Sequence, residues 1–322
     1  MKTLLFALIA IGASAFADVT FTEQPGRVRV EIGGQLFTEY HYDDAPRVYY
    51  WPLMGPGGVK MTRSYPMENA ENEEHDHLHH RSLWFSHGSV NGMDFWTEDP
   101  EHKRTGKNAP GTIKHVKILA KENGAKFGVL QTEQKWVAPD GTVPLRSVQT
   151  LRVYDGPSTD RVFDFEIALT AGEKDVVFGD TKEGTFAMRI AESMRLVQPK
   201  GKGEGRGSIV NSEGAKDAKA WGQRANWVAM SGPIGEKNYT ITFLSHPSNL
   251  RAPQRWHARD YGLFAVNPFC EHDMNKSQPK GTGNYTLKAG ETLTLKYRIA
   301  ITEGDAAAAK CAERFAEYSK ER

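Results

Sequence analysis

Four successive segments between residues 112 and 171 alternate apolar and polar side chains, and this pattern constrains the fold more than any other feature of the chain. Alternation with a period of two is typical of strands that bury one face. The segments meet at Asn123-Gly124, Pro139-Asp140-Gly141 and Asp155-Gly156-Pro157, which are favoured turn sequences. The sequence therefore predicts a run of long antiparallel hairpins.

Shorter segments with the same alternation occupy residues 19–50, 239–249 and 285–302, and we also expect a short strand over residues 59–65. The alanine-rich tail, residues 305–322, has the pattern of a helix. No internal repeat and no change of composition divides the chain. We therefore predict an all-β fold, a large antiparallel β-sandwich in which residues 18–322 form a single domain with a short C-terminal helix.

Residues 1–17 have the pattern of a secretory signal peptide. Lys2 precedes an apolar run over residues 4–11, and the small residues Ala15 and Ala17 form an A-x-A-like cleavage site. The apolar run is too short to span a bilayer, and no later stretch is apolar enough to do so. We therefore expect a periplasmic or secreted protein that is cleaved near Ala17.

Charge and motif content exclude several classes of function. The chain has 41 Lys and Arg against 40 Asp and Glu, interleaved throughout, which is not the footprint of a nucleic-acid or membrane-surface protein. It lacks the nucleophile-elbow, phosphate-loop, dinucleotide-binding, H-E-x-x-H and C-x-x-C motifs. Export would allow a disulfide between its two cysteines, Cys270 and Cys311, and the sequence leaves this pairing open.

Residues 71–96 are the densest group of titratable and aromatic side chains. Acidic residues and large aromatic residues surround five of the eleven histidines, namely His75, His77, His79, His80 and His87. Such groups titrate near neutral pH, bind metals or stack on rings. We therefore expect a functional site in this stretch.

One interpretation of the histidines is a metal site. On an extended strand, His75, His77 and His79 would share one face, because side chains of alternate residues point the same way. Neutral imidazoles of this kind bind zinc or copper, and Asp76 or Glu183 would supply a carboxylate ligand. The possible cofactor is therefore a divalent metal, and otherwise none is expected.

A second interpretation needs no metal. His79 or His80, hydrogen-bonded to Asp76 or Asp94, would transfer a proton near neutral pH, and Glu183 would act from the opposite side of the substrate. A third interpretation is purely structural, with the histidines holding a loop through hydrogen bonds to the backbone. The sequence leaves all three open.

A second group of candidate residues lies between residues 255 and 269. Alternation would place His257, Arg259 and Tyr261 on one face of a strand and Trp256 on the other. A histidine beside a guanidinium offers a proton carrier next to a clamp for a carboxylate or hydroxyl group. Alternatively, Arg259 forms a structural ion pair with Asp260 or Asp180.

The candidates fall into two sets. The predicted catalytic residues are Asp76, His77, His79, His80, Glu183, His257 and Arg259. The predicted substrate-binding residues, chosen for ring faces and polar groups near the histidines, are Arg81, Trp84, His87, Asn91, Asp94, Trp96, Trp256 and Tyr261.

Four ordered motifs resemble those of a family of exported bacterial proteins. They are WPLMGPGGVKMTRSYP, DHLHHRSLWFSHGSVNGMDFW, GDTKEGTFAMRIAE and WHARDYGLFAVNPF, within a similarity that spans Tyr40 to Thr302. This family of unknown function is commonly labelled PmoA-like, or "methane oxygenase PmoA". The resemblance implies a β-sandwich linked with carbohydrate use, and it supplies no catalytic residues.

We therefore expect an exported carbohydrate-active protein, of the supersandwich type seen in sugar mutarotases, that acts on a small-molecule or oligosaccharide substrate. Its reaction would be hydrolysis, elimination or epimerisation, with His79 and His80 as acid or base, Asp76 as their orienting group and Glu183 as the opposing carboxylate. A non-catalytic glycan-binding module is an alternative. A further alternative is the histidine-ligated metalloprotein that the family label suggests.

Overall fold

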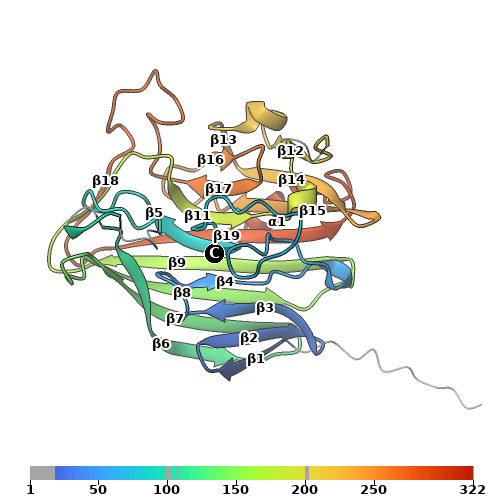
Figure 1. The fold of residues 1–322 in the computed structure, drawn as a ribbon, viewed down its shortest axis with the longest axis horizontal. Helices are drawn as coiled ribbons and strands as arrows, with labels where there is room; N and C mark the ends of the chain where they lie inside the picture. The colour runs from blue at the N-terminus through green and yellow to red at the C-terminus, as the bar shows by residue number, and fades with distance from the viewer. Residues whose placement is uncertain (1–18, 99–102, 107–108, 200–202, 322) are drawn as a thin grey trace, which may run out of the picture.

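The computed structural model describes residues 19–98, 103–106, 109–199 and 203–321. The predicted signal peptide, residues 1–17, lies outside the described residues. Within them, the strands form a nine-stranded sheet, an eight-stranded sheet and a two-stranded ribbon, all antiparallel (Figure 1). The all-β prediction is confirmed.

The spatial order of the strands gives the two large sheets. The nine-stranded sheet contains β1 (Val19–Gln24), β2 (Arg27–Ile32), β3 (Gln35–His41), β4 (Tyr49–Tyr50), β5 (Leu83–His87), β11 (Gly184–Arg189), β17 (Leu263–Asn267), β16 (Gln254–Ala258) and β13 (Arg224–Ala225). The eight-stranded sheet contains β12 (Ser208–Asn211), β14 (Trp227–Ile234), β15 (Lys237–Ser245), β19 (Thr292–Glu303), β9 (Asp160–Ala171), β8 (Leu145–Tyr154), β7 (Phe127–Val137) and β6 (Thr112–Glu122). The ribbon pairs β10 (Val176–Phe178) with β18 (Tyr285–Leu287).

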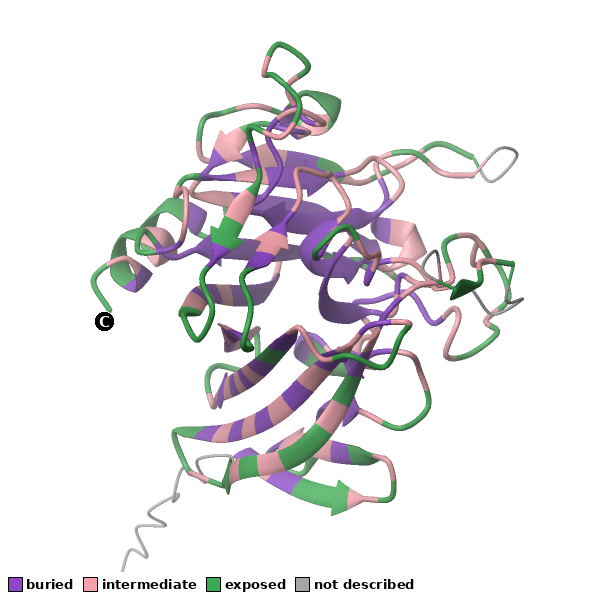
Figure 2. Cartoon of the chain, turned by 90° about the vertical axis from the view of Figure 1, so that its left-hand side faces the viewer, coloured by how far each residue is buried: buried purple, intermediate pink, exposed green. Residues whose placement is uncertain are grey.

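The four long segments expected from the alternation are strands β6 to β9. In β7, β8 and β9 buried positions alternate with half-buried or exposed ones, which Figure 2 shows as colour bands along the long strands in its lower half. The prediction of a strand over residues 59–65 is wrong. This segment makes only isolated β-bridges, such as that between Thr62 and Ile190.

Aromatic side chains from both large sheets fill the space between them. The ring of Phe186 in β11 lies 4.2 Å from that of Phe165 in β9 and 5.4 Å from that of Phe243 in β15, measured between centroids. Burying one such side chain contributes about 1.5–3 kcal/mol. These contacts join the two sheets into one sandwich.

Three central strands of the nine-stranded sheet, β5, β11 and β17, are buried at every position. One face of these strands packs on the interior of the sandwich. The other face, which we call the outer face, is covered by loops that contain the predicted site residues. A strand that is buried on both faces loses the alternating pattern, so its sequence reads differently from that of β7 or β8.

The tail contributes the helix α1 (Cys311–Tyr318), which is shorter than the predicted 305–322 and is the one α-helix in the described ranges. Cys270 and Cys311 are both buried and free, so no disulfide joins them. The described part of the chain contains no helix that is long and apolar enough to cross a membrane.

Candidate functional site

A row of residues across the outer face sets the position of the site. Trp84 in β5 pairs with Ala187 in β11, Ala187 pairs with Ala265 in β17, and Ala265 pairs with His257 in β16. Because the two central residues are alanines, there is room above them for the indoles of Trp84 and Trp96, whose ring centroids are 5.2 Å apart. Both indoles are fully buried, so they form the floor of the site.

Arg63 fixes the loop that lies over this floor. Its side chain is fully buried, and its guanidinium donates hydrogen bonds of 2.9–3.2 Å to the backbone carbonyls of Tyr65, Glu74, Asp76 and His77. Only arginine offers enough donors in one fixed fork for this set of acceptors. The loop includes His77 in the left-handed region, with φ of 42°, a conformation that non-glycine residues keep when surrounding contacts hold them.

Asp76 and His77 form a carboxylate–imidazole pair at the centre of the loop. Oδ2 of Asp76 lies 2.5 Å from Nδ1 of His77, while Oδ1 accepts hydrogen bonds from Arg63 and, at 3.1 Å, from Arg189. Burial alone would raise the pKa of Asp76, but the hydrogen bond from His77 and the charges of Arg189 and Arg63 hold it well below its usual range. Asp76 is therefore ionised and accepts the Nδ1 proton of His77, so Nε2 is the ring nitrogen left for a substrate or a water molecule.

The ring of His77 is part of a stack of parallel rings. It lies 4.7 Å from His80 and 5.3 Å from Tyr261, with interplanar angles of 9° and 8°. His80 in turn stacks on Trp84 at 5.3 Å. The side chain of His77 is 42 % exposed, so this histidine is both fixed by its neighbours and open to solvent.

His79 and His80 lie beneath His77 and are neutral. Burial lowers the pKa of His79 to about 3, and burial together with the nearby charges lowers that of His80 well below its usual value. Nη1 of Arg189 donates to Nδ1 of His80 at 3.3 Å. The expectation that Asp76 orients His79 or His80 is therefore wrong, because the carboxylate points to His77 instead.

Tyr261 is the point at which three distant segments meet. Burial raises its pKa to about 12, the charges of Arg259 and Arg189 lower it, and the carboxylates of Glu183 and Asp76 raise it. The guanidinium carbons of Arg189 and Arg259 lie 4.8 Å and 5.2 Å from the centre of its ring. Arg259 and the histidine loop therefore meet at Tyr261, while the approach of Glu183 to this loop stays a prediction.

His257 lies at the opposite end of the row of alanines. Its Nδ1–H donates to the backbone carbonyl of Lys182 at 3.0 Å, so Nε2 carries the lone pair. Nε2 is buried and has no hydrogen-bond partner among the described residues, and the same holds for Nε1 of Trp221, whose ring lies 6.2 Å from that of His257. Burial lowers the pKa of His257 to about 3, so the ring is a neutral acceptor.

Two predicted substrate-binding residues face the interior of the sandwich instead of the site. Trp256 packs between the sheets beside Phe243, and its indole N–H donates to the carbonyl of Ala225 at 2.9 Å. His87 is fully buried, and its Nε2–H donates to the carbonyl of Gly179 at 2.9 Å. Both predictions need correction, because strand alternation turns these side chains away from the outer face.

Three others are already engaged in local structure. Arg81 forms two hydrogen bonds of 2.9 Å to the carboxylate of Glu98. Asn91 is a turn residue whose Oδ1 accepts from the backbone N–H of Val177 at 2.7 Å. Asp94 caps its own loop by accepting from the backbone N–H groups of the next residues and from Arg104. These contacts hold the local loops in place, and substrate contact by these three residues stays a prediction.

The extended strand on which the metal prediction was based does not form. The ring of His75 stacks on that of Tyr65 at 4.4 Å, while the rings of His77 and His79 are 5.7 Å apart and nearly perpendicular. Within residues 19–98, 103–106, 109–199 and 203–321, no three His, Cys, Asp or Glu side chains are arranged to hold a metal ion. Zinc or copper binding stays a prediction that no ligand set in these residues supports.

Two important residues, Arg63 and Arg189, are not among the predicted catalytic and substrate-binding residues. Both have side chains with no exposure, and both contact Asp76. The alternation of GTFAMR would have indicated Arg189, because Phe186 and Met188 belong to one face of this strand and Arg189 to the other. No comparable signal indicates Arg63, whose segment is irregular.

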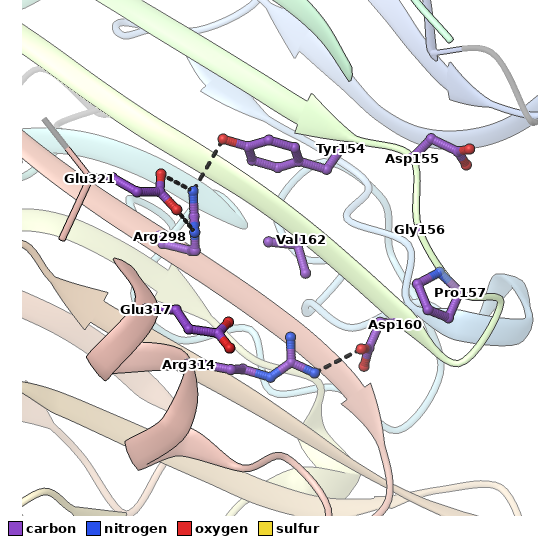
Figure 3. A pocket seen from close by; sticks show the side chains of 10 residues that line it. All are labelled: Tyr154, Asp155, Gly156, Pro157, Asp160, Val162, Arg298, Arg314, Glu317 and Glu321. Carbon is purple, nitrogen blue, oxygen red and sulfur yellow. Dashed lines mark hydrogen bonds and ion pairs between the residues drawn. The ribbon is translucent and has the colours of Figure 1, made fainter. Parts of the chain in front are cut away.

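A cavity that is lined by none of the predicted site residues lies on the face of the eight-stranded sheet beside α1. It has a volume of about 420 Å³, and Figure 3 shows its lining residues. Arg314 pairs with Asp160 at 2.7 Å, and Arg298 is bound by Glu321 and Tyr154. Because these charged groups neutralise each other, this cavity is a weaker candidate for a functional site than the cluster around His77.

The fold and the cluster together define an antiparallel β-sandwich protein with histidine, carboxylate and arginine side chains gathered on the outer face of one sheet. The chain belongs to a family of unknown function, DUF6807, whose model matches residues 27–316. This agrees with the predicted membership of an uncharacterised family, while the PmoA-like label stays a prediction. No curated protein matches the chain.

Several solved structures show a loose likeness. Galactose 1-epimerase from Lactobacillus acidophilus NCFM is 7% identical, with 89% of this chain and 98% of that chain covered and a TM-score of 0.39. An aldose epimerase homologue from C. elegans is 7% identical, with 89% and 100% covered and a TM-score of 0.32. A glycoside hydrolase family 97 enzyme from Pseudoalteromonas sp. strain K8 is 9% identical, with 89% and 34% covered and a TM-score of 0.30.

Proposed function

We propose that this protein is an exported carbohydrate-active enzyme that transfers protons to and from a sugar or glycoside, in a hydrolysis, elimination or epimerisation. The observation that carries the proposal is the pair formed by Asp76 and His77. Their 2.5 Å contact fixes the imidazole, and the ring is half-exposed beside Tyr261. Export is supported by the signal-peptide pattern of residues 1–17.

His77 is the proton acceptor in this proposal. Asp76 holds the Nδ1 proton, so Nε2 of the neutral ring is the atom that takes a proton from the substrate or from a water molecule. The ionised carboxylate then stabilises the imidazolium that forms. The rings of His80 and Tyr261, which lie parallel to it at 4.7 Å and 5.3 Å, restrict its rotation.

Tyr261 and Glu183 are the candidates for the opposing group. The pKa of Tyr261, raised to about 12 mainly by burial, keeps the phenol neutral and able to donate a hydrogen bond or a proton. Glu183 is about a third exposed and pairs with Lys182. The half-buried ring of Trp221 offers a surface on which the apolar face of a sugar can stack.

The test is the substitution His77→Asn, assayed against a panel of neutral and acidic glycosides with analysis of the products. Asparagine tolerates the left-handed backbone of residue 77 and removes the proton acceptor. We expect a loss of turnover of about 10²- to 10⁴-fold with substrate binding retained, which is the usual contribution of a general base.

His75→Asn is the matched control, because His75 stacks on Tyr65 and has no ring contact with the Asp76–His77 pair. It should retain the turnover of the unmodified protein. If His77→Asn also retains full turnover, His77 is not the base and the proposal fails. Glycan binding without turnover in the unmodified protein would indicate a binding module instead.

A further inference from the structure

We infer that Arg259 and Trp221 form a subsite for the carboxylate of an acidic sugar, such as a uronic acid. This inference rests on the proposed function, because it names the class of substrate that the same site accepts. It concerns the part of the site beyond Tyr261, on the side away from the Asp76–His77 pair.

Among the three arginines of the site, Arg259 is the one whose guanidinium is accessible to a ligand. The side chains of Arg63 and Arg189 have no exposure and bind Asp76, whereas that of Arg259 is 36 % exposed. Its one ion pair within the described residues joins Nε to Asp260 at 3.9 Å, beyond hydrogen-bond distance. Asp260 already accepts a hydrogen bond from the backbone N–H of Tyr261 at 3.0 Å.

Two rings hold the guanidinium in place. The guanidinium carbon of Arg259 lies 5.2 Å from the ring centre of Tyr261 and 5.8 Å from that of Trp221. Cation–π contacts of this kind position an arginine through its flat face and leave its N–H groups free at the edge. Those N–H groups form the fork that matches the two oxygens of a carboxylate.

Two further polar atoms at this end of the site have no partner among the described residues. Nε2 of His257 is an acceptor in a side chain that is 2 % exposed, and Nε1 of Trp221 is a buried donor. Leaving a buried polar group unpaired is unfavourable, so such atoms indicate a polar ligand. A sugar hydroxyl can donate to the first atom and accept from the second.

A small cavity lies beside Trp221 and Arg259. Its volume is about 210 Å³, and Trp221, Arg259 and Asp260 are among its lining residues. That is below the roughly 300 Å³ at which pockets for drug-sized ligands begin, so the cavity suits a single sugar residue or one end of a chain. Arg259 and His77 both neighbour Tyr261, at 5.2 Å and 5.3 Å from its ring centre, so the subsite adjoins the proposed catalytic pair.

The experiment compares the binding of glucuronate and galacturonate with that of glucose and galactose, measured by titration in NMR at low ionic strength. We expect the unmodified protein to prefer the acidic sugars, and Arg259→Gln to weaken their binding by about 10- to 100-fold, the usual strength of hydrogen bonds to charged groups. Binding of the neutral sugars should not change. Added salt should weaken the binding of the acidic sugars.

Arg146→Gln is the matched control, since Arg146 is exposed on β8 of the other sheet, paired with Glu133. It removes the same charge and should leave all binding unchanged. The inference is overturned if acidic and neutral sugars bind equally well, if Arg259→Gln weakens both to the same extent, or if no acidic sugar binds.

The two proposals fail in different ways. Turnover of neutral glycosides that is lost in His77→Asn, without binding of acidic sugars, would support the proposed function and overturn the subsite. Binding of acidic sugars that depends on Arg259, with full activity in His77→Asn, would support the subsite and overturn the role of His77.

Discussion

Replacing Asp76 by asparagine removes one negative charge from between two buried arginines. Asp76 is the carboxylate that pairs with Arg63 in the described residues, and the other carboxylates near Arg189, those of Glu74 and Glu192, lie 3.9 Å and 3.8 Å away. Breaking a buried ion pair by removing one partner costs about 3–5 kcal/mol. The side chain of Asp76 is 32 % exposed, and asparagine keeps one acceptor oxygen. After this discount for solvent screening, we expect a loss of about 2–3 kcal/mol in the free energy of unfolding.

The assay is urea denaturation of the unmodified protein and Asp76→Asn at several pH values. The folded-state pKa of Asp76 is depressed, so its contribution is complete above the unfolded value of about 3.9 and is lost as the pH falls further. The difference between the two proteins should therefore be constant from pH 8 to about pH 5 and shrink in more acidic buffer.

Asp175→Asn is the control, because Asp175 forms an exposed pair with Lys288 that solvent screens, so its loss should change stability little. If Asp76→Asn costs no more than this control, Asp76 does not neutralise Arg63 and Arg189 in the folded protein. The reasoning about the Asp76–His77 pair would then be refuted at its electrostatic basis, whatever the activity.

Two other predictions concern the buried groups around the site. Burial lowers the pKa values of four histidines: to about 3 for His79 and His257, to about 4 for His87, and well below the usual value for His80. These rings therefore stay neutral in the folded protein, but in the unfolded chain they bind protons below about pH 6.5. Stability should therefore fall from pH 7 to pH 5 by up to about 1.4 kcal/mol per pH unit for each ring, and urea denaturation that shows equal stability at both pH values would contradict this. Ala187→Leu should lower the free energy of unfolding by about 1–3 kcal/mol in the same assay, because the larger side chain displaces the indoles of the floor. A loss below about 0.5 kcal/mol would show that the space above Ala187 is not filled.

The fold was predictable because the information for it is local. Strands such as β7 and β8 bury one face, so alternation and turn sequences indicate them directly. The segment over residues 59–65 carries similar residues, but Arg63 must reach the loop at Asp76, and the chain there is irregular. Its conformation depends on contacts that short patterns do not encode.

The site was predictable only in part. Asp76 and His77 are neighbours in sequence, yet the arginine that binds Asp76 from β11 lies 113 residues away. Such a contact depends on which strands pair, and no local pattern specifies it. Trp256 shows a different error, since the alternation that places His257 on the outer face also places Trp256 in the interior.

The more informative signal lies in the small residues. Along β11 and β17, Ala187 and Ala265 alternate with Phe186, Phe264 and Val266, which fill the interior. If the loops only had to shield the outer face from solvent, large side chains could occupy both alanine positions. Because they do not, two indoles fit deep against the sheet and the ring stack begins beneath the loop instead of in solvent. The histidines mark where chemistry is possible, but the alanines determine that the reactive ring is held at the surface of a rigid sheet.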